Sequence, residues 1–365
     1  MQDTNDGSWF STGDGKVGAE RVKARVLRNA GAILVVFLLA LSAGCRTTGD
    51  DPGGIEAGKG TPNGDRVFLT VDFQQGQTLR YRFVSNREIA LDWDPNAAAS
   101  QNRVQKQVEQ LEMVVAYTAL EVDPYGVSTV QATCESIEAR RAGGPAQRTV
   151  ANDAVQSARG KTFTFKVDSR GKIVDAAELE AFIKKMGAKA FRADSSRGRV
   201  KEPDMIGDFT ASQWFLWDSV SSVELPAEGV GVGQSWVSKL LVPTPMVIRQ
   251  ARNVTYTLKE IRAGDAAAVA VIESAYSAAD AVPAAWPVPY AGRFQMSGTF
   301  GFLGGYQVLA LQGSGQELFD IDAGRVLKRA QMYRMEMRAS LPPMGIRANP
   351  HLTIDQSLTM ELLNP

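Results

Sequence analysis

The chain has few of the residues on which common catalytic and metal sites depend. Its 365 residues include only two cysteines and one histidine, His351. A single histidine excludes histidine pairs and leaves most Ser-His or Cys-His arrangements without a partner. The sequence also lacks a Gly-x-Ser-x-Gly segment, and its glycine-rich stretch 298–315 has none of the phosphate-loop spacings. We therefore expect no enzyme, no metal site and no cofactor.

The chain also has no excess of charge of either sign. Lysine plus arginine and aspartate plus glutamate number 40 each. A basic protein attracts nucleic acid through its overall charge, and this chain lacks that attraction. We expect no nucleic-acid partner, so any partner has to be recognised locally.

The chain contains one long apolar run, and it is too short to be a permanent membrane helix. Lys23, Arg25 and Arg28 precede the run from Ala30 to Leu41. A helix that spans a bilayer needs roughly 20 apolar residues, whereas basic residues followed by a short apolar run and small residues are typical of an export signal. We predict a signal segment over residues 1–44.

The end of this signal carries a short motif. Leu41-Ser-Ala-Gly-Cys45 resembles the bacterial lipobox, which implies that Cys45 is acylated and becomes the first residue of the mature protein. Arg46, in place of aspartate, implies an outer-membrane location facing the periplasm. Assigning Cys45 to lipid leaves Cys134 alone, so no internal disulfide is expected.

The mature chain begins with a tether and continues as strands. Residues 45–64 are rich in glycine, proline and polar residues, as flexible linkers are. From there the pattern alternates: Leu79, Tyr81 and Phe83 fall on one face of a strand, as do Leu352 and Ile354 near the C-terminus. Such alternation predicts half-buried strands.

Three sequence blocks occur twice in the same order. The pairs are Gly76-Gln-Thr with Gly233-Gln-Ser, Tyr117-Thr-Ala-Leu-Glu-Val with Tyr256-Thr-Leu-Lys-Glu-Ile, and Phe165-Lys-Val-Asp with Phe319-Asp-Ile-Asp. The third block in each set ends in a glycine-containing hairpin turn. We predict two tandem related β units, over residues 65–175 and 230–365.

Helices are expected between the two units, in residues 176–229. Asp175 and Glu178 have the spacing of a capping box, and apolar residues then recur at helical spacing. A second helix is predicted from Pro203 to Ser222. The predicted fold is therefore mainly β (α+β): antiparallel sheets from two related units, curved or forming a half-barrel, with inserted helices.

The repeated blocks, together with the segment LPAEGVGVGQSW, resemble an uncharacterised class of envelope lipoproteins of planctomycete-type bacteria. The resemblance covers most of the mature chain. It implies a lipoprotein and no particular activity, so it assigns no functional residues here.

Two local features are candidate binding surfaces. The first is a basic stretch that could contact anionic lipid headgroups or another acidic polymer, although a solvated helix end is the plainer interpretation. It comprises Lys184, Lys185, Lys189, Arg192, Arg197, Arg199 and Lys201. The second feature is the aromatic group Trp214, Phe215 and Trp217, which could line an apolar cavity or simply form core.

These features predict a lipid-anchored envelope protein with a non-enzymatic binding or scaffolding role. Its partners would be the membrane, through the anchor, and an envelope protein or apolar ligand. A lipid or lipoprotein carrier with a continuous apolar cavity is the alternative, and a hydrolase is a third hypothesis that the single histidine disfavours.

Overall fold

The structure is a computed structural model that describes residues 66–96, 104–143, 153–263, 267–283, 286–341 and 349–363. The chain divides into two units, Met1–Lys59 and Gly60–Pro365. The predicted signal segment, Cys45 and the tether up to residue 64 lie outside the described residues. The fold described is therefore that of the second unit.

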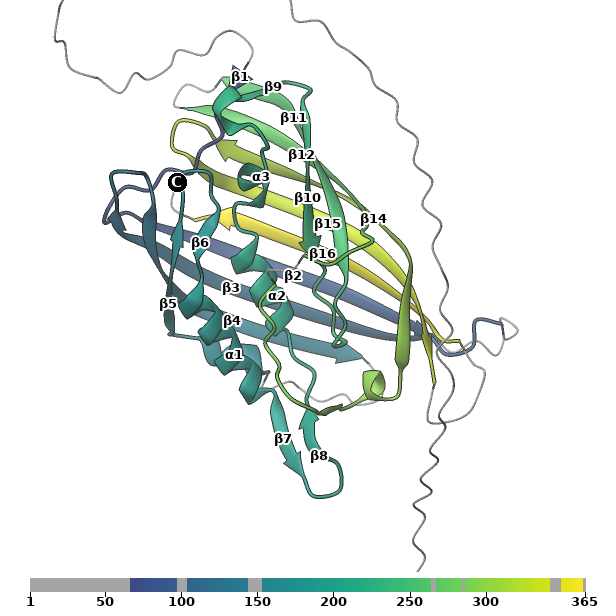
Figure 1. Ribbon diagram of the computed structural model, residues 1–365. Helices are drawn as coiled ribbons and strands as arrows, with labels where there is room; N and C mark the ends of the chain where they lie inside the picture. Colours follow the sequence, from purple (N-terminus) through teal and green to yellow (C-terminus); the bar gives the residue numbers. More distant parts are fainter. Residues whose placement is uncertain are drawn as a thin grey trace, which may run out of the picture. The chain divides into compact units, whose positions relative to one another are not determined.

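One open antiparallel sheet of eleven strands forms most of this unit (Figure 1). In spatial order it contains β10 (Ser235–Leu241), β11 (Ala251–Ala263), β12 (Ala268–Ala278), β14 (Gly304–Asp320), β15 (Arg325–Ser340), β16 (His351–Leu362), β2 (Thr78–Asp92), β3 (Val104–Val122), β4 (Ser128–Gly143), β5 (Thr162–Val167) and β6 (Ile173–Asp175). The prediction of a mainly β, antiparallel fold is confirmed.

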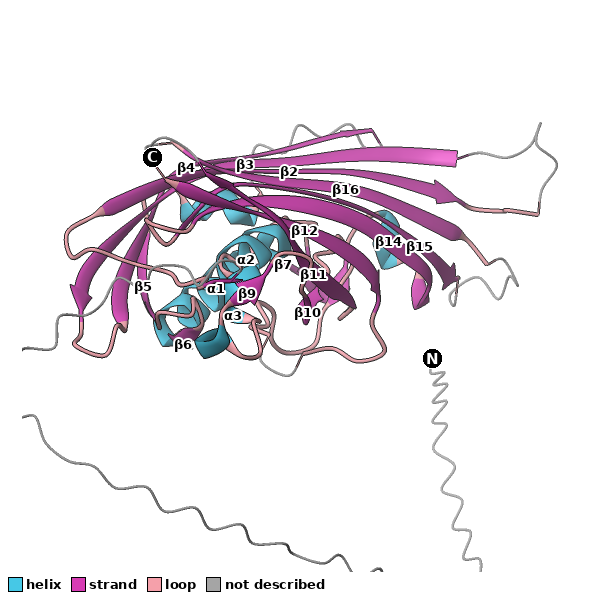
Figure 2. Cartoon of the chain, turned by 90° about the horizontal axis from the view of Figure 1, so that it is seen from above, coloured by secondary structure: helices cyan, strands magenta, loops and turns pink. Residues whose placement is uncertain are grey.

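The remaining elements are short. β1 (Arg66–Val67) pairs with β9 (Val230–Gly231), and a small sheet contains β13 (Gln295–Met296), β8 (Gly198–Lys201) and β7 (Phe191–Asp194). The helices are α1 (Ala177–Lys189), α2 (Ile206–Trp214) and α3 (Asp218–Ser221), with 3-10 turns at Ala154–Ala158, Pro226–Glu228 and Thr299–Gly301. Figure 2 shows the large sheet arching over the helices, which therefore lie against its concave face.

The core lies between the concave face and the helices because the strand residues alternate. Leu79, Tyr81 and Phe83 of β2 are buried, as predicted, and the residues between them are half-buried or exposed. The same strand also turns Ser85 and Arg87 inward, and both are buried. The inward face therefore contains polar groups that need buried partners.

The two sequence repeats have the same backbone geometry. Gly76 and Gly233 both have positive φ. The amide of Gly76 donates to the carbonyl of Ala119 over 2.8 Å, and the amide of Gly233 donates to that of Leu258 over 2.7 Å. Each repeat then carries a hydroxyl pair 2.8 Å long, Thr78 with Thr118 and Ser235 with Thr257. A β-bulge follows at the same place, between Ala119 and Glu121 and between Leu258 and Glu260. The repeats therefore share geometry as well as sequence.

β16 joins the two repeats into one sheet. It pairs with β15 on one side and with β2 on the other, in antiparallel register along its whole length. The sheet order therefore places the second repeat first and the first repeat second, with β16 between them. The predicted boundaries at residues 64, 175 and 229 stay predictions.

Two local helix predictions were wrong. The stretch from Pro203 to Ser222 forms α2 and α3 rather than one helix. The break occurs where the carbonyls of Phe215 and Leu216 accept hydrogen bonds from Arg329 of β15, which takes these acceptors away from a continuing helix. The capping box at α1 is also absent, since Glu178 accepts bonds from Thr164 instead.

The segment before β2 is held between two hairpin turns, one from each repeat. The amide of Val71 donates to the backbone carbonyl of Ser169 over 2.7 Å. The amide of Asp72 donates to the carbonyl of Gly324 over 3.1 Å. Gly324 has φ 59°, and a Cβ there would lie 2.5 Å from the Asp72 nitrogen. The close approach of this segment requires glycine.

We predict that Gly324→Ala lowers the free energy of unfolding by about 3 kcal/mol, because it combines a strained φ with a backbone clash. Chemical denaturation measures the loss. Gly233→Ala is the matched control: its φ is 84° but its Cβ would meet nothing within 4 Å, so about 1 kcal/mol is expected. Equal losses for the two variants would contradict the proposed close packing.

Candidate functional site

Arginines with little or no solvent exposure lie on the concave face of the sheet. Among them are Arg87 on β2, Arg252 on β11 and Arg329 on β15. Arg87 and Arg252 are 1% and 4% exposed, and the Arg329 side chain is 11% exposed. A guanidinium stays charged in proteins, so each of these groups needs compensation for its lost hydration.

Arg87 is fully compensated by two buried carboxylates. Its Nη2 atom contacts both oxygens of Asp208 on α2 at 2.7 and 2.6 Å, and its Nη1 atom donates to Glu109 of β3 over 2.7 Å. Burial alone would raise the pKa of Glu109, but the guanidinium groups of Arg87 and Arg141 hold it below its usual value. These ion pairs attach α2 to the sheet.

Arg141 extends this network to a further carboxylate. It donates to Glu109 over 2.7 Å and to Asp153 over 2.8 Å. Asp153 also accepts from the amide of Val155 at the start of the first 3-10 turn. Burial raises the pKa of Asp153 to about 6, and Arg141 only partly opposes this effect.

Arg329 is compensated in a second network. It forms an ion pair with Glu317 of β14, and its two terminal nitrogens donate to the carbonyls of Phe215 and Leu216. Glu317 also accepts from Ser219 over 2.6 Å. This network holds the segment between α2 and α3 against β15.

Arg252 differs from both because none of the described residues forms an ion pair with it. Its Nη2 atom donates to Gln331 over 2.8 Å, and its guanidinium carbon lies 4.4 and 4.7 Å from the ring centres of Tyr276 and Tyr333. Its Nε and Nη1 atoms meet no hydrogen-bond acceptor among the described residues. Two buried donors are therefore left over.

Glycines on β14 make room for the two tyrosines. A Cβ at Gly313 would lie 2.6 Å from the Cα and Cβ atoms of Tyr333, and a Cβ at Gly315 would lie 2.5 Å from the Tyr276 hydroxyl. Side chains at these positions would displace the rings. The glycines therefore leave room for Tyr276 and Tyr333, whose rings each contact the guanidinium of Arg252.

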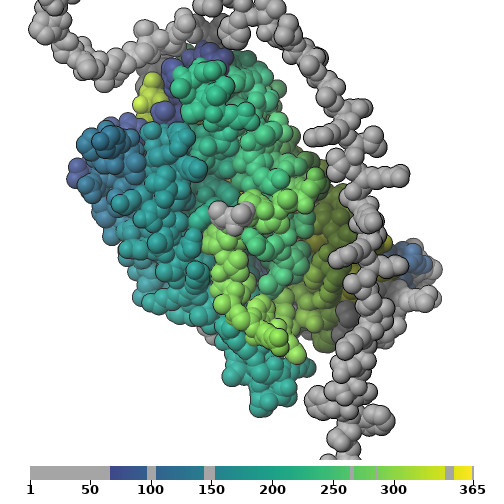
Figure 3. Space-filling model, viewed as in Figure 1, coloured from purple at the N-terminus to yellow at the C-terminus, as the bar shows by residue number. Residues whose placement is uncertain are grey.

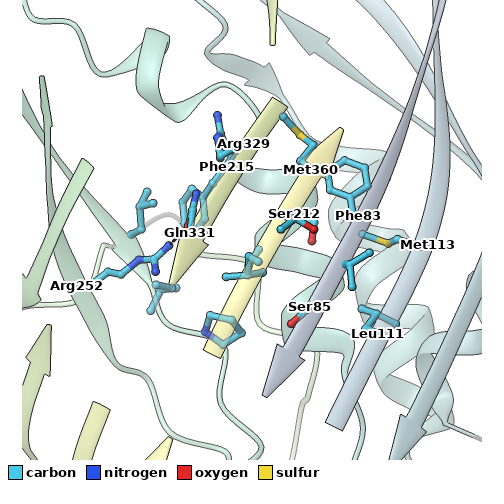
Figure 4. A pocket seen from close by; sticks show the side chains of 17 residues that line it. Phe83, Ser85, Leu111, Met113, Ser212, Phe215, Arg252, Arg329, Gln331 and Met360 are labelled. Carbon is cyan, nitrogen blue, oxygen red and sulfur yellow. Dashed lines mark hydrogen bonds between the residues drawn. The ribbon is translucent and has the colours of Figure 1, made fainter. Parts of the chain in front are cut away.

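Arg252 lines a cavity between the sheet and α2 (Figure 4). The volume of the cavity is about 50 Å³, room for a few water molecules or a small organic group. Figure 4 shows Arg252 and Gln331 on one side, and Phe83, Leu111 and Met113 on the other. The cavity therefore has a polar side and an apolar side.

Only part of the predicted aromatic group lines this cavity. Phe215 lies in its wall. Trp217 is 2% exposed and packs against Phe73 and Tyr117 in the core, while Trp214 is half-buried beside the core. Helical spacing predicted one shared face, but the helix ends at Trp214, so the three side chains diverge.

Six of the seven residues of the basic stretch are exposed. They lie on α1 and on the β7–β8 hairpin: Lys184, Lys185, Lys189, Arg192, Arg197 and Arg199. Lys201 is not part of this surface. It is 1% exposed, forms an ion pair with Asp204 over 2.7 Å and lies 4.3 Å from the ring centre of Tyr290. Contact of the other six with an anionic surface stays a prediction.

The proline-rich segment packs against the protein itself. Figure 3 shows the chain before β14, in light green, crossing the helix-covered side next to the β7–β8 region. Trp286 stacks on Phe215 with ring centres 5.3 Å apart, and the Tyr290 hydroxyl donates to Asp204 over 2.6 Å. This segment forms an outer layer over α1 and α2.

The remaining candidates are isolated. Cys134 is buried, and burial raises its pKa to about 12, so the thiol is protonated at neutral pH. His351 lies exposed at the start of β16. In the described part of the chain no three metal-binding side chains meet, and no helix there is long and apolar enough to cross a membrane.

The sequence interpretation missed Arg252, although a signal was present. Arg252, Val254 and Tyr256 alternate along one strand, which places an arginine on the inward face. The same alternation places Arg87 on the inward face of β2.

The comparisons with known proteins give one partial family match and one distant structural similarity. A model described as "Family of unknown function (DUF6263)" matches residues 128–278, from β4 to β12. No curated protein matches the chain. Among solved structures, the chain is similar to a protein described as "lipid-protein interactions in lipovitellin", with 9% identity and a TM-score of 0.38. The match covers 80% of this chain and 26% of that one, so this chain spans about a quarter of that protein's length.

We predict that Arg87→Met lowers the free energy of unfolding by about 3 to 5 kcal/mol, because Asp208 is left as an unpaired buried charge. Arg82→Met is the matched control from the same strand. Arg82 pairs with Glu112 on the opposite, exposed face, so about 1 kcal/mol or less is expected. Urea unfolding compares the variants; similar losses would show that the buried network does not secure α2.

Proposed function

We propose that this protein is an exported, lipid-anchored envelope protein that binds a small, largely apolar ligand in the cavity between the sheet and α2, without chemical conversion of the ligand. The cavity carries the proposal. Its walls combine apolar side chains from β2, β3 and β16 with a few polar groups from β11 and β15. This composition is typical of pockets that bind small organic molecules.

The size of the cavity favours a single small ligand over bulk lipid. A lipid or lipoprotein carrier needs a continuous apolar space, and here α1, α2 and α3 occupy the concave face. A volume of about 50 Å³ accommodates one small group. Carriage of larger lipids would require α2 to leave the sheet and break the Arg87–Asp208 ion pair.

Export and anchoring rest on the sequence. The basic residues before residue 30, the short apolar run and the small residues before Cys45 support cleavage and acylation at that cysteine. Exposed basic side chains on α1 and β7–β8 would suit an anionic membrane surface close to the anchor. On this proposal the folded region is tethered to the outer membrane, facing the periplasm.

We predict that purified protein releases about one small apolar molecule per chain on denaturation, and that Ala211→Phe releases less than about a tenth of this amount. Ala211 of α2 lines the cavity, so a phenyl ring there would fill it. Mass spectrometry of an organic extract provides the measurement.

Ala181→Phe is the control for this experiment, because Ala181 lies exposed on α1 and should leave the ligand content unchanged. Equal release from Ala211→Phe and the parent protein, or no release from either when ligand is supplied, would contradict binding in this cavity.

We predict that the intact mass of membrane-extracted protein corresponds to a chain that begins at Cys45 and carries acyl groups. A Cys45→Ser variant should lack both the cleavage and the acyl mass, because the thiol is the acylated atom. An unmodified or uncleaved N-terminus in the parent protein would disprove lipid anchoring and would leave the cavity proposal standing.

A further inference from the structure

We propose that the convex face of the large sheet binds a neutral, extended polysaccharide along one row of side chains that crosses eight strands. This face lies opposite the helices, on the outside of the arch in Figure 2, so the surface is separate from the cavity. The residues of the row, called the neutral row, are Val237, Thr255, Ala275, Ser314, Met332, Ser357, Asn86 and Gln110.

Strand pairing places each member of the neutral row directly opposite the next. The pairs begin with Val237 and Thr255 on β10 and β11, and they end with Asn86 and Gln110 on β2 and β3. The pairs between them are also in register. All eight side chains are exposed or half-buried. Because neighbouring strands lie about 4.8 Å apart, the row is roughly 34 Å long.

The neutral row contains no charged side chain, whereas the same face carries ion pairs outside the row. Arg82 pairs with Glu112, and Lys106 pairs with Glu88. A charge within a contact loses hydration, and a neutral partner offers no counter-charge in return. A long contact without charges therefore suits a partner that is itself neutral.

The polar members of the row suit a partner rich in hydroxyl and amide groups. Thr255, Ser314 and Ser357 carry hydroxyls, and Asn86 and Gln110 carry amides. Each of these side chains both donates and accepts hydrogen bonds. Sugar hydroxyl and acetamido groups have the same double capacity, so a polysaccharide can form bonds in either direction along the row.

Met332 stands between two open hollows in the centre of the row. Their volumes are about 540 and 570 Å³, and Ser314, Met332 and Ser357 line both of them. The Met332 side chain is apolar, and the residue is 63% exposed. Sugar rings that lie along the row would enter the hollows and place their C–H groups against this side chain.

Other macromolecules fit the neutral row less well. The energetically dominant residues of protein interfaces are enriched in Trp, Tyr and Arg, and nucleic acids and anionic lipid headgroups are bound through Lys and Arg. None of these four residue types occurs among the eight residues of the row. The row therefore favours a neutral polysaccharide.

The test titrates two neutral, extended sugar chains, chitohexaose and cellohexaose, into the full-length, detergent-extracted protein by calorimetry. We expect the parent to bind at least one hexaose at least about tenfold more tightly than the corresponding disaccharide, because only the longer chain reaches several strands. Met332→Glu should weaken this binding at least about tenfold, since its carboxylate would lose hydration against a neutral chain.

Two variants control for the shape of the side chain and for the added charge. Met332→Gln is similar in length and stays neutral, so its affinity should remain within about threefold of that of the parent. Gln307→Glu adds the same carboxylate to an exposed position of β14 outside the row, opposite Arg338, and should bind as the parent does. Circular dichroism checks that each variant is folded.

Salt distinguishes the neutral row from the exposed basic residues of α1 and β7–β8. Binding through the row should be unchanged between about 0.05 and 0.5 M salt, because screening acts only on charges. A steep loss of hexaose binding with salt would place the sugar on the charged surface and overturn the proposal.

Three other results would also overturn it: no binding of either hexaose, equal affinity of the parent and Met332→Glu, or parent dimers that Met332→Glu abolishes and hexaose leaves intact. Such dimers, measured by sedimentation, would show that a second copy of the chain covers this face.

Discussion

The ion pair between Arg87 and Asp208 determines where α2 lies, and the cavity depends on α2. Asp208 is in the first turn of α2, and Arg87 projects from the middle of the sheet's concave face. Both groups are buried, so their separation would leave two unpaired charges without water, at a cost of several kcal/mol. A helix held in this way keeps Ala211, Ser212 and Phe215 at a fixed distance from β2, β3 and β16. The cavity is therefore a rigid feature of the fold.

The two repeats explain why the cavity on the concave face has one polar side and one apolar side. The repeats place equivalent strands in equivalent registers, and β16 adds one strand between them. Equivalent positions then face the same cavity from opposite directions, as Met113 and Arg252 do. Divergence at one such position changes the chemistry of one wall without changing the backbone that carries it.

The alternation of apolar residues and the repeated blocks were sufficient to predict the strands, their antiparallel pairing and the correspondence of the two repeats, because these features depend on short-range patterns. The break after α2 was not predictable, since it depends on hydrogen bonds from Arg329, more than 100 residues later in the chain. The cavity was missed for the same reason. An inward arginine at residue 252 can be predicted from β11 alone, but the absence of a counter-ion depends on the register of β12, β14 and β15.

The energetics of Arg252 show how a buried guanidinium without an ion pair among the described residues is kept in the fold. Removing a guanidinium from water costs several kcal/mol, and each ring contact contributes about 2 kcal/mol at a desolvated site. One hydrogen bond to Gln331 adds about 1.5 to 3 kcal/mol. These contributions hold the group in place, but Nε and Nη1 are buried without a hydrogen-bond acceptor among the described residues, so part of the desolvation cost stays uncompensated.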